Sequence, residues 1–131
     1  MSAEQNKALV RRFFEAHEGK ADLDALDHML APDFVSHVRR LPGQQPDREG
    51  YKWSVAEFAA AFSNRRVLVE EQVAEGDTVV TRFTVHATHD RRELMGVAPT
   101  GRELTNRAIV IHRLVEGRSP RSGAWERSAQ H

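Results

Sequence analysis

Four histidines stand in or beside stretches of this sequence that are typical of β-strands: His37, His86, His89 and His112. Histidine exchanges its proton near neutral pH, so it is a natural general acid or base. One carboxylate, Glu126, lies beside a tryptophan near the end of the chain. A fold that brought a histidine and this carboxylate into one pocket could move protons on and off a bound small molecule.

Alternation along the strand predicted at 79–88 decides which groups can share a pocket, because successive side chains point to opposite faces. The apolar face, expected to point inward, holds Phe83, Val85, Ala87 and His89. The opposite face, expected outside or at a dimer interface, holds Arg82, Thr84, His86 and Thr88. A bulge or strong curvature would instead bring Arg82 and His86 inward. His112 shares a face with Ala108 and Val110, and a slip of one residue would reverse it.

Composition argues against several classes of protein. The chain has no cysteine, which excludes a disulfide scaffold and a thiol nucleophile. His86 and His89 would point to opposite faces of a strand, so we expect no metal site. A formal net charge of zero gives no support to nucleic-acid binding. No apolar run approaches the ~20 residues of a membrane span. Without a signal-peptide pattern either, the expected location is the cytoplasm.

The elements that must position these residues are predicted as helices first and strands afterwards. Ser2 and Gln5 have the spacing of a capping box, and the helix behind them has an apolar face of Leu9, Val10, Phe13, Phe14 and His17. A second helix begins after Asp22 and ends before Pro32, and a third carries Val55, Phe58, Ala59 and Phe62.

Strands are predicted at 34–38, 67–74, 79–88 and 104–115, with a weaker one at 124–128. Helices followed by strands with short turns indicate a single α+β domain over residues 1–131, in which helices cover one face of an antiparallel sheet.

Several segments, in order, also resemble a known family. They are NKALVRRFFEA, LDALDHMLAPDFVSH, EGYKWSVAEFAAAF, VLVEEQVAEGDTVVTRFTVHATH, ELMGVAPTGR and VEGR. Their spacing, with His37 after the first strand and Met-Gly…Pro-Thr-Gly after the long one, resembles the SnoaL-like polyketide cyclase (ester cyclase) family. This family is part of the nuclear-transport-factor-2-like superfamily.

The resemblance implies a cone-shaped barrel, with a curved, mostly antiparallel sheet wrapped around N-terminal helices and a homodimer formed through the sheet. It also implies an intramolecular aldol ring closure that uses a carboxylate and needs neither metal nor cofactor. The end of the chain departs from the family pattern, because Ala129 stands where counting from Trp125 places the acid/base aspartate. Either Glu126 replaces that aspartate, or the protein does not run the reaction.

Three hypotheses remain. The first is a cyclase, isomerase or lyase for a small apolar carbonyl compound, with His37 or His112 as acid/base, Glu126 as carboxylate and His89 as orienting donor. A cone-shaped barrel leaves its wide end unfilled, so the expected pocket lining is Trp53, Phe62, Phe83 and Trp125, with Met95 at the entrance. The second is a small-ligand binding protein without chemistry, motivated by Ala129. The third, a hydrolase of the epoxide-hydrolase kind, needs more inward carboxylates than the strands offer.

Overall fold

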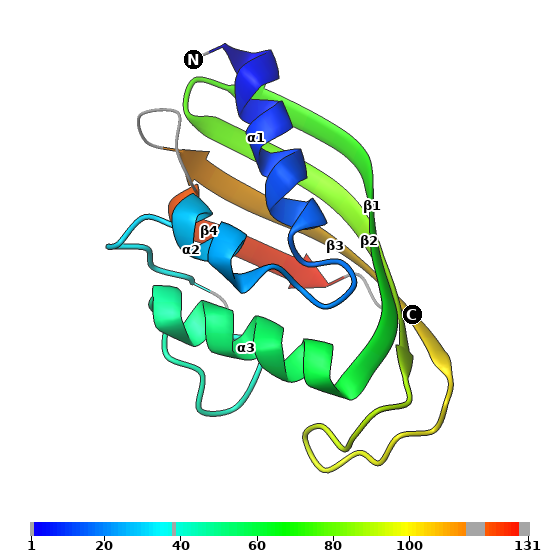
Figure 1. The fold of residues 1–131 in the computed structure, drawn as a ribbon. Helices are drawn as coiled ribbons and strands as arrows, with labels where there is room; N and C mark the ends of the chain where they lie inside the picture. The colour runs from blue at the N-terminus through cyan, green and yellow to red at the C-terminus, as the bar shows by residue number, and fades with distance from the viewer. Residues whose placement is uncertain (1, 38, 115–119, 129–131) are drawn as a thin grey trace.

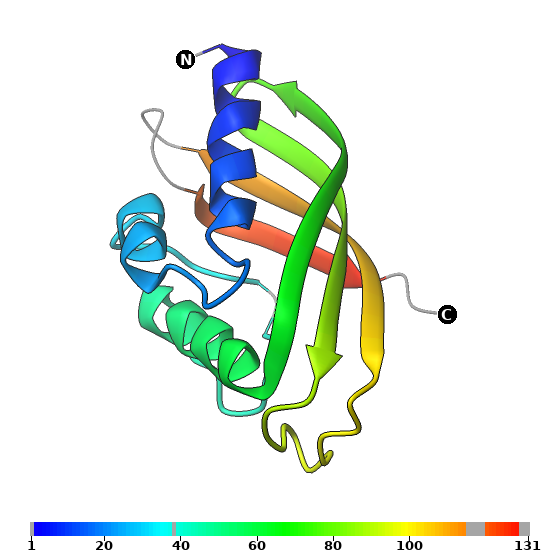
Figure 2. The same cartoon turned by 45° about the vertical axis from the view of Figure 1, so that its right-hand side comes forward.

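Three helices precede four strands in the structure, a computed structural model that describes residues 2–37, 39–114 and 120–128. The helices are α1 (Ala3–Glu15), α2 (Leu23–Met29) and α3 (Arg48–Ala61). The strands are β1 (Phe62–Glu75), β2 (Thr78–His89), β3 (Glu103–Leu114) and β4 (Pro120–Ser128). They form one antiparallel sheet in sequence order, which curves around the helices on its concave side (Figure 1 and Figure 2). The predicted cone-shaped α+β fold is confirmed.

Local capping chemistry sets where each helix begins. The Ser2 hydroxyl accepts a hydrogen bond from the Gln5 backbone N–H, and the Gln5 side chain accepts one from the Ser2 N–H, which is the predicted capping box. Asp22 caps α2 through the Ala25 N–H at 3.0 Å, as the sequence also predicted. Asp47 caps α3 through the Gly50 N–H at 2.8 Å. These caps satisfy backbone donors that a helix start leaves free.

The strand predicted at 34–38 is wrong over its described residues. Phe34 to His37 form an irregular segment in which Ser36 makes a single bridge, and residue 38 lies outside the described part of the chain. The Ser36 N–H donates to the Pro46 carbonyl at 2.8 Å. Proline has no N–H to return, so a ladder cannot continue from this contact. This hydrogen bond ties the segment to the loop before α3.

β1 starts at Phe62, directly after α3 and earlier than predicted. Its pairing with β2 is interrupted between Ser63 and Arg66 and again between Val69 and Glu71. Asn64, with φ of 53°, lies inside the first interruption. A bulge of this kind bends a strand and increases its twist. Weak strand formers such as Ser63 and Asn64 hid this part of β1 from the sequence prediction.

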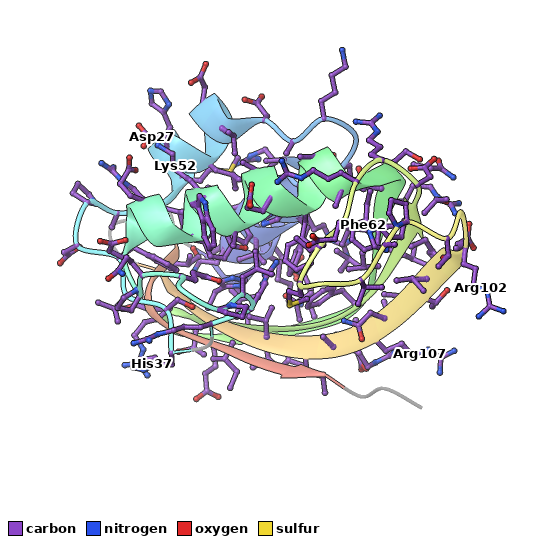
Figure 3. All side chains as sticks on the ribbon, turned by 90° about the horizontal axis from the view of Figure 1, so that it is seen from below. Asp27, His37, Lys52, Phe62, Arg102 and Arg107 are labelled. Carbon is purple, nitrogen blue, oxygen red and sulfur yellow. The ribbon has the colours of Figure 1, made fainter. Side chains whose placement is uncertain are left out.

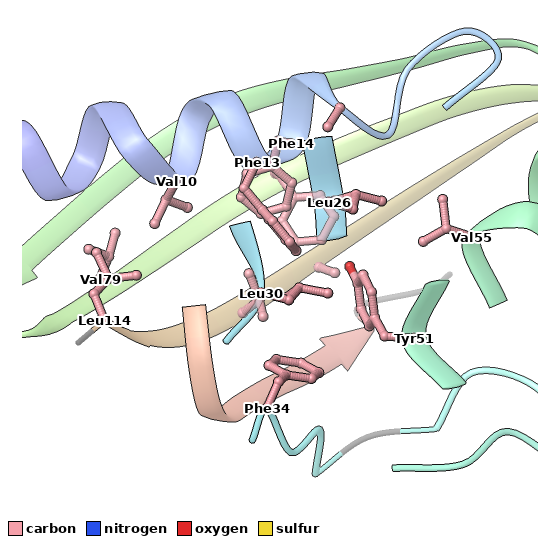
Figure 4. Close-up of a cluster of buried hydrophobic side chains, with 14 residues drawn as sticks. Val10, Phe13, Phe14, Leu26, Leu30, Phe34, Tyr51, Val55, Val79 and Leu114 are labelled. Carbon is pink, nitrogen blue, oxygen red and sulfur yellow. The ribbon is translucent and has the colours of Figure 1, made fainter. Parts of the chain in front are cut away.

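The core fills the space between the concave face of the sheet and the helices (Figure 4). Phe13 and Phe14 of α1, Leu26 of α2 and Val55 of α3 are buried in it. The sheet contributes alternate residues of β2 and β3, among them Val79, Phe83, Ala108, Val110 and Leu114. The predicted inward face of β2 is confirmed, and the exposed Arg82 lies on the other face.

Candidate functional site

A chain of hydrogen bonds runs through the interior from Arg40 to the end of α1. Arg40 Nη2 donates to the Tyr51 hydroxyl oxygen at 3.2 Å. That hydroxyl lies 2.6 Å from His17 Nε2, and His17 Nδ1 lies 2.8 Å from the Phe13 carbonyl oxygen. A carbonyl can only accept, so Nδ1 carries the proton and Nε2 accepts from Tyr51. Each hydrogen bond in the chain therefore has its donor on the Arg40 side and its acceptor on the α1 side.

His112 of β3 joins this group through the ring of Phe13. The Phe13 ring centroid lies 5.0 Å from that of His112 and 4.7 Å from that of His17, with edge-to-face geometry in both pairs. His112 is 3% exposed, and its Nδ1 has no hydrogen-bond partner among the described residues. Buried polar atoms normally have partners, so this nitrogen is a candidate contact for a bound molecule.

Burial decides the charge of both histidines. Burial, followed by the Arg40 guanidinium, lowers the pKa of His17 to about 3. The hydrogen bond from His17 to the Phe13 carbonyl raises this pKa, but by less than Arg40 lowers it. Burial first, and Arg40 second, likewise lower the pKa of His112 to about 3. Both rings are therefore neutral at pH 7. Each has one nitrogen that donates and one that accepts, and neither adds to the positive charge of Arg40.

The loop before α3 holds Arg40 in place. Gln44 is 2% exposed, and its Oε1 accepts from the backbone N–H groups of Arg40 at 2.9 Å and Leu41 at 3.3 Å. A Cβ on Gly50 would lie 2.0 Å from the Gln45 carbonyl oxygen. The absent side chain at position 50 thus lets this loop pack directly on the first turn of α3. The Arg40 guanidinium in turn stacks over the Tyr51 ring, 5.2 Å from its centroid.

A second arginine lies close to this group. Arg65 Nη1 donates to the Gly19 carbonyl at 3.2 Å, just beyond the end of α1. Burial lowers the pKa of the Arg65 guanidinium, and the positive charge of Arg40 lowers it further. The Arg40–Tyr51–His17 chain, with His112 and Gln44, therefore forms a buried polar cluster beside a second arginine. We call this group the Tyr51 cluster.

Two of the predicted site residues lie at this end of the core. His112 belongs to the Tyr51 cluster, and Phe83 packs on Phe14 with ring centroids 4.7 Å apart. Trp125 and Glu126 are paired by backbone register with Ile111 and Val110 of β3, beside His112. Their side chains, and Ala129, lie outside the described residues.

His89 and Phe62 form a separate contact at the far end of β2. Their rings stack at 4.6 Å, and His89 Nε2 lies 2.7 Å from the Arg92 carbonyl oxygen. Val79, the β2 neighbour of His112 in the sheet, is ten residues away from His89 along the strand. The structure therefore does not bring His89 and His112 together.

The remaining predicted residues are exposed. His37 lies at the margin of the molecule (Figure 3) and outside the Tyr51 cluster. Trp53 on α3 is 42% exposed and Met95 in the loop after β2 is 57% exposed. Among the residues that the structure describes, no group of three metal-binding side chains comes together. No described helix is long and apolar enough to cross a membrane.

Sequence reasoning missed Tyr51, Gln44 and Arg40 as site residues. His17 was assigned only to the apolar face of the first helix. Its position there, four residues after Phe13, was the available signal, because a histidine on a buried face needs hydrogen-bond partners. Nothing local to the sequence pointed to Arg40 or Tyr51 as those partners.

Comparison with known proteins defines the class of this fold and site. The family model for SnoaL-like polyketide cyclases matches residues 8–121. The chain belongs to this family, as the sequence resemblance indicated. No curated protein matches the chain.

Solved structures agree with this assignment. The chain is 32% identical to IdmH of Streptomyces antibioticus, a candidate polyketide cyclase, with a TM-score of 0.75 over 95% of this chain and 92% of that one. AclR of Streptomyces galilaeus, a candidate hydroxylase, is 27% identical, with a TM-score of 0.81 over 97% of this chain and 76% of that one. TsrD of Streptomyces laurentii is 21% identical and shares the fold, with a TM-score of 0.83 over 98% and 91% of the two chains.

Proposed function

We propose that this protein catalyses a cofactor-free acid–base reaction of a small, mostly apolar carbonyl compound bound at the Tyr51 cluster. The reaction is either an aldol-type ring closure or an isomerisation. The observation that carries the proposal is the buried Arg40–Tyr51–His17 hydrogen-bond chain beside His112, in a member of the polyketide cyclase family. The fold alone does not choose the reaction, since a structural neighbour is named as a candidate hydroxylase.

Both reactions begin by removing a proton from a carbon beside a carbonyl group. The negative charge then moves to the carbonyl oxygen, and donors placed in advance around that oxygen lower the barrier. Arg40 supplies such donors and a positive charge. In ring closure the carbanion attacks a second carbonyl carbon of the same molecule. The new alkoxide then takes up the proton that the base removed.

We assign the proton transfer to His112, to Glu126, or to both acting together. His112 presents a buried Nδ1, and the sheet register puts position 126 opposite Val110, two residues before His112. A neutral imidazole whose pKa is about 3 is a weak base before substrate binds. An enolate that forms beside it favours the imidazolium and raises this pKa, because opposite charges attract strongly in a buried site. His37 and His89, assigned roles from the sequence, lie elsewhere and are not part of this proposal.

Exchange of α-hydrogens for deuterium tests the proposal without knowledge of the natural substrate. Small aromatic β-diketones and β-ketoesters are incubated with the protein in deuterated buffer, and NMR follows the loss of the α-proton signal. We expect faster exchange with the native protein and a loss of about 10²–10⁴-fold in His112→Asn or Glu126→Gln. His28→Asn, on the exposed end of α2, is the matched control. Full activity in both site variants would overturn the assignment.

A binding protein without chemistry is the second candidate, and two observations favour it. Ala129 replaces the acid expected from the family pattern, and the two buried histidines stay neutral over the physiological range. Under this alternative a ligand protects the Tyr51 cluster from solvent and is recovered unchanged, with no acceleration of α-proton exchange.

We also propose that two copies associate through the outer face of the sheet. Leu68, Val73 and Ile109 are 54%, 60% and 44% exposed, and the register places all three on this face. Exposed apolar side chains that gather on one face are typical of an interaction surface.

A further inference from the structure

We propose that residues 93–99, at the tip of the loop between β2 and β3, form a flap that opens while the rest of the core stays folded, and that this opening admits a small apolar molecule. The molecule is the substrate of the proposed function, on which this part of the inference rests. The motion of the flap itself does not depend on any substrate, so motion and entry can be tested separately.

The flap is a small hairpin with its own hydrogen bonds. Leu94 and Val97 exchange two backbone hydrogen bonds, both of 3.0 Å, and Glu93 Oε1 accepts from the Gly96 N–H at 3.0 Å. Met95 and Gly96 have positive φ values of 52° and 79°, which a tight two-residue hairpin turn requires. These bonds lie within the flap and do not break when it moves. The flap can therefore swing as one unit.

The base of the loop is held by backbone hydrogen bonds that lie outside the flap. The His89 N–H donates to the Arg102 carbonyl at 3.1 Å, and the His89 carbonyl accepts from the Gly101 N–H at 2.8 Å. On the other side the Arg91 N–H donates to the Ala61 carbonyl at 3.0 Å. Gly101, with φ of 74°, supplies the backbone freedom that a hinge needs. The base therefore stays in place when the flap moves.

A single buried side chain docks the flap on the protein. Within the loop between β2 and β3, only Leu94 is buried, at 8% exposed. It clusters with Leu41 of the loop before α3 and Ala61 at the end of α3, and Phe58 and Phe62 pack against them. We call these five residues the Leu94 cluster, which is separate from the main core. A segment with so little buried apolar surface opens more easily than a core strand.

An ion pair beside the flap adds a second, weaker tie. Arg92 Nη2 lies 2.6 Å from Glu57 Oε2 on α3, and the two side chains are 48% and 32% exposed. Ion pairs that are open to solvent contribute little to stability. The closed position therefore depends mainly on Leu94.

Exposed apolar side chains on and beside the flap suit an apolar visitor. Met95 and Val97 are 57% and 56% exposed. Leu104, near the start of β3, is 48% exposed although its register with Ala87 places it on the inner face of the sheet. The loop lies beside the end of α3 (Figure 2), where the helices and the sheet meet. Apolar groups gathered at one exposed place are typical of contacts with an apolar molecule.

The Leu94 cluster adjoins the Tyr51 cluster along the chain. Gln44 Oε1 accepts from the backbone N–H of Leu41 at 3.3 Å and from that of Arg40 at 2.9 Å. Leu41 thus belongs to the Leu94 cluster, and the residue before it belongs to the Tyr51 cluster. A molecule that displaces Leu94 arrives beside the segment that carries Arg40.

Thiol labelling measures the opening, because the chain has no cysteine and one introduced thiol reports on one position. Leu94→Cys is treated with the thiol reagent DTNB at several urea concentrations below the unfolding transition. We expect labelling slower by about 10-fold or more than in Met95→Cys at the exposed tip, with a rate that urea hardly changes. Val110→Cys, at a position 5% exposed on β3, should label only through global unfolding and therefore with a steep urea dependence.

Two further comparisons sharpen this measurement. Leu41→Cys, at the other side of the Leu94 cluster, keeps the test decisive if Leu94→Cys is poorly folded and should show the same weak urea dependence. Glu57→Gln breaks the ion pair with Arg92 and should speed labelling about 2- to 5-fold. Glu49→Gln is the matched control, since Glu49 pairs with Lys52 on the same helix, and should not change the rate.

Two results would overturn the flap. A urea dependence in Leu94→Cys as steep as that in Val110→Cys would make residues 93–99 part of the cooperative core. Labelling of Leu94→Cys as fast as that of Met95→Cys would mean that Leu94 is not docked.

A reversible cross-link tests entry. Leu41→Cys combined with Leu94→Cys is joined by a bis-methanethiosulfonate, and dithiothreitol later cleaves the link. Binding of the neutral apolar dye N-phenyl-1-naphthylamine, followed by stopped-flow fluorescence, should be slowed about 10-fold or more by the cross-link and should recover on reduction. The same variant with both thiols capped by methyl methanethiosulfonate should bind as fast as the reduced protein. Equal rates with and without the link, or no binding of the dye by the native protein, would overturn entry through the flap.

Failure of this inference can be told apart from failure of the proposed function. If the cross-linked and reduced proteins exchange the α-protons of a carbonyl compound at equal rates, the function stands and the flap is not the entrance. If the cross-link controls entry of the dye and no compound exchanges its α-protons, the flap is an entrance to a protein without the proposed chemistry.

Discussion

The hydroxyl oxygen of Tyr51 lies 2.6 Å from Nε2 of His17, and the two residues are 34 positions apart in the sequence. His17 follows α1 and Tyr51 lies in the first turn of α3, so this contact fixes the two helices against each other inside the core. The hydroxyl also accepts from Arg40, which adds the loop between α2 and α3 to the same point.

Tyr51→Phe should destabilise the protein although it removes only one oxygen atom. The change leaves His17 Nε2 as a buried acceptor without a donor, which costs about 1–3 kcal/mol. Urea unfolding at pH 7 measures the effect. Trp53→Phe, two residues along α3 on an exposed site, is the control and should stay within about 0.5 kcal/mol of the native protein. Equal stability of native protein and Tyr51→Phe would show that the contact contributes nothing to folding.

The protein should begin to lose stability as the pH falls below 6.5, which is above the pH at which carboxylates titrate. The folded pKa of both His17 and His112 is about 3, below the ordinary value of 6.5, so protons bind the unfolded chain first. The stability that these neutral rings contribute is present above pH 6.5 and is lost as the pH falls toward 3. Each ring should reduce the free energy of unfolding by ~1.4 kcal/mol per pH unit in the steep part of this window.

Urea unfolding at pH 6.5, 5.5 and 4.5 gives this slope. His112→Phe keeps an aromatic ring and should lower the slope by about half, since one of two titrating rings is gone. Trp53→Phe, on an exposed site of α3, removes no titrating group and should leave it unchanged. A slope in His112→Phe equal to that of the native protein would contradict neutral burial of His112.

Leu68→Glu should convert the proposed dimer to a monomer. Leu68 lies on the outer face of β1 and is 54% exposed. Leu104 is a matched control, because it is 48% exposed yet pairs with Ala87 on the inner face. Light scattering coupled to size-exclusion chromatography should give the mass of one chain for Leu68→Glu and of two chains for Leu104→Glu. A monomeric native protein would refute the dimer directly.

His89→Leu should loosen the loop between β2 and β3 without affecting the Tyr51 cluster. The His89 backbone carbonyl accepts from the N–H groups of Thr100 at 3.1 Å and Gly101 at 2.8 Å, and its ring contacts the Arg92 carbonyl. Hydrogen–deuterium exchange should speed up in residues 90–102 and stay constant in α1. Met95→Ala, at the exposed tip of the loop, should leave exchange at Thr100 and Gly101 as it is. Faster exchange in α1 as well would mean that His89 supports the whole core.

Short-range patterns in the sequence predicted most of the fold. The Ser2–Gln5 capping box, the Asp22 cap and the inward alternation of β2 each depend on residues within a few positions of one another, so they could be inferred directly. The strand predicted at 34–38 failed for a longer-range reason. The Ser36 N–H donates to the carbonyl of Pro46, which has no N–H to return, and Phe34 of the apolar run is buried in the core.

The site was harder to predict than the fold, for a related reason. Alternation alone placed His112 on the same face of its strand as Ala108 and Val110. The Arg39–Arg40 pair, however, has one exposed and one partly buried member, and the sequence does not distinguish them. The two arginines differ in burial because of the path that the loop takes across α3. Gln44 and Gly50, which follow Arg40 by four and ten residues, determine this path. His37 and His89 were chosen for their chemistry, yet His37 is exposed and β2 places His89 ten residues from Val79, the neighbour of His112.

Gly50 has a consequence for attempts to stabilise this protein. Glycine inside a helix costs about 1 kcal/mol relative to alanine, so a consensus or propensity-based redesign would select this position early. Here the added methyl group would collide with the Gln45 carbonyl and push away the segment that carries Arg40 and Gln44. Helix propensity and the close packing of this loop therefore make opposite demands on one residue. Thermostable variants should be sought elsewhere on α3, with position 50 left unsubstituted.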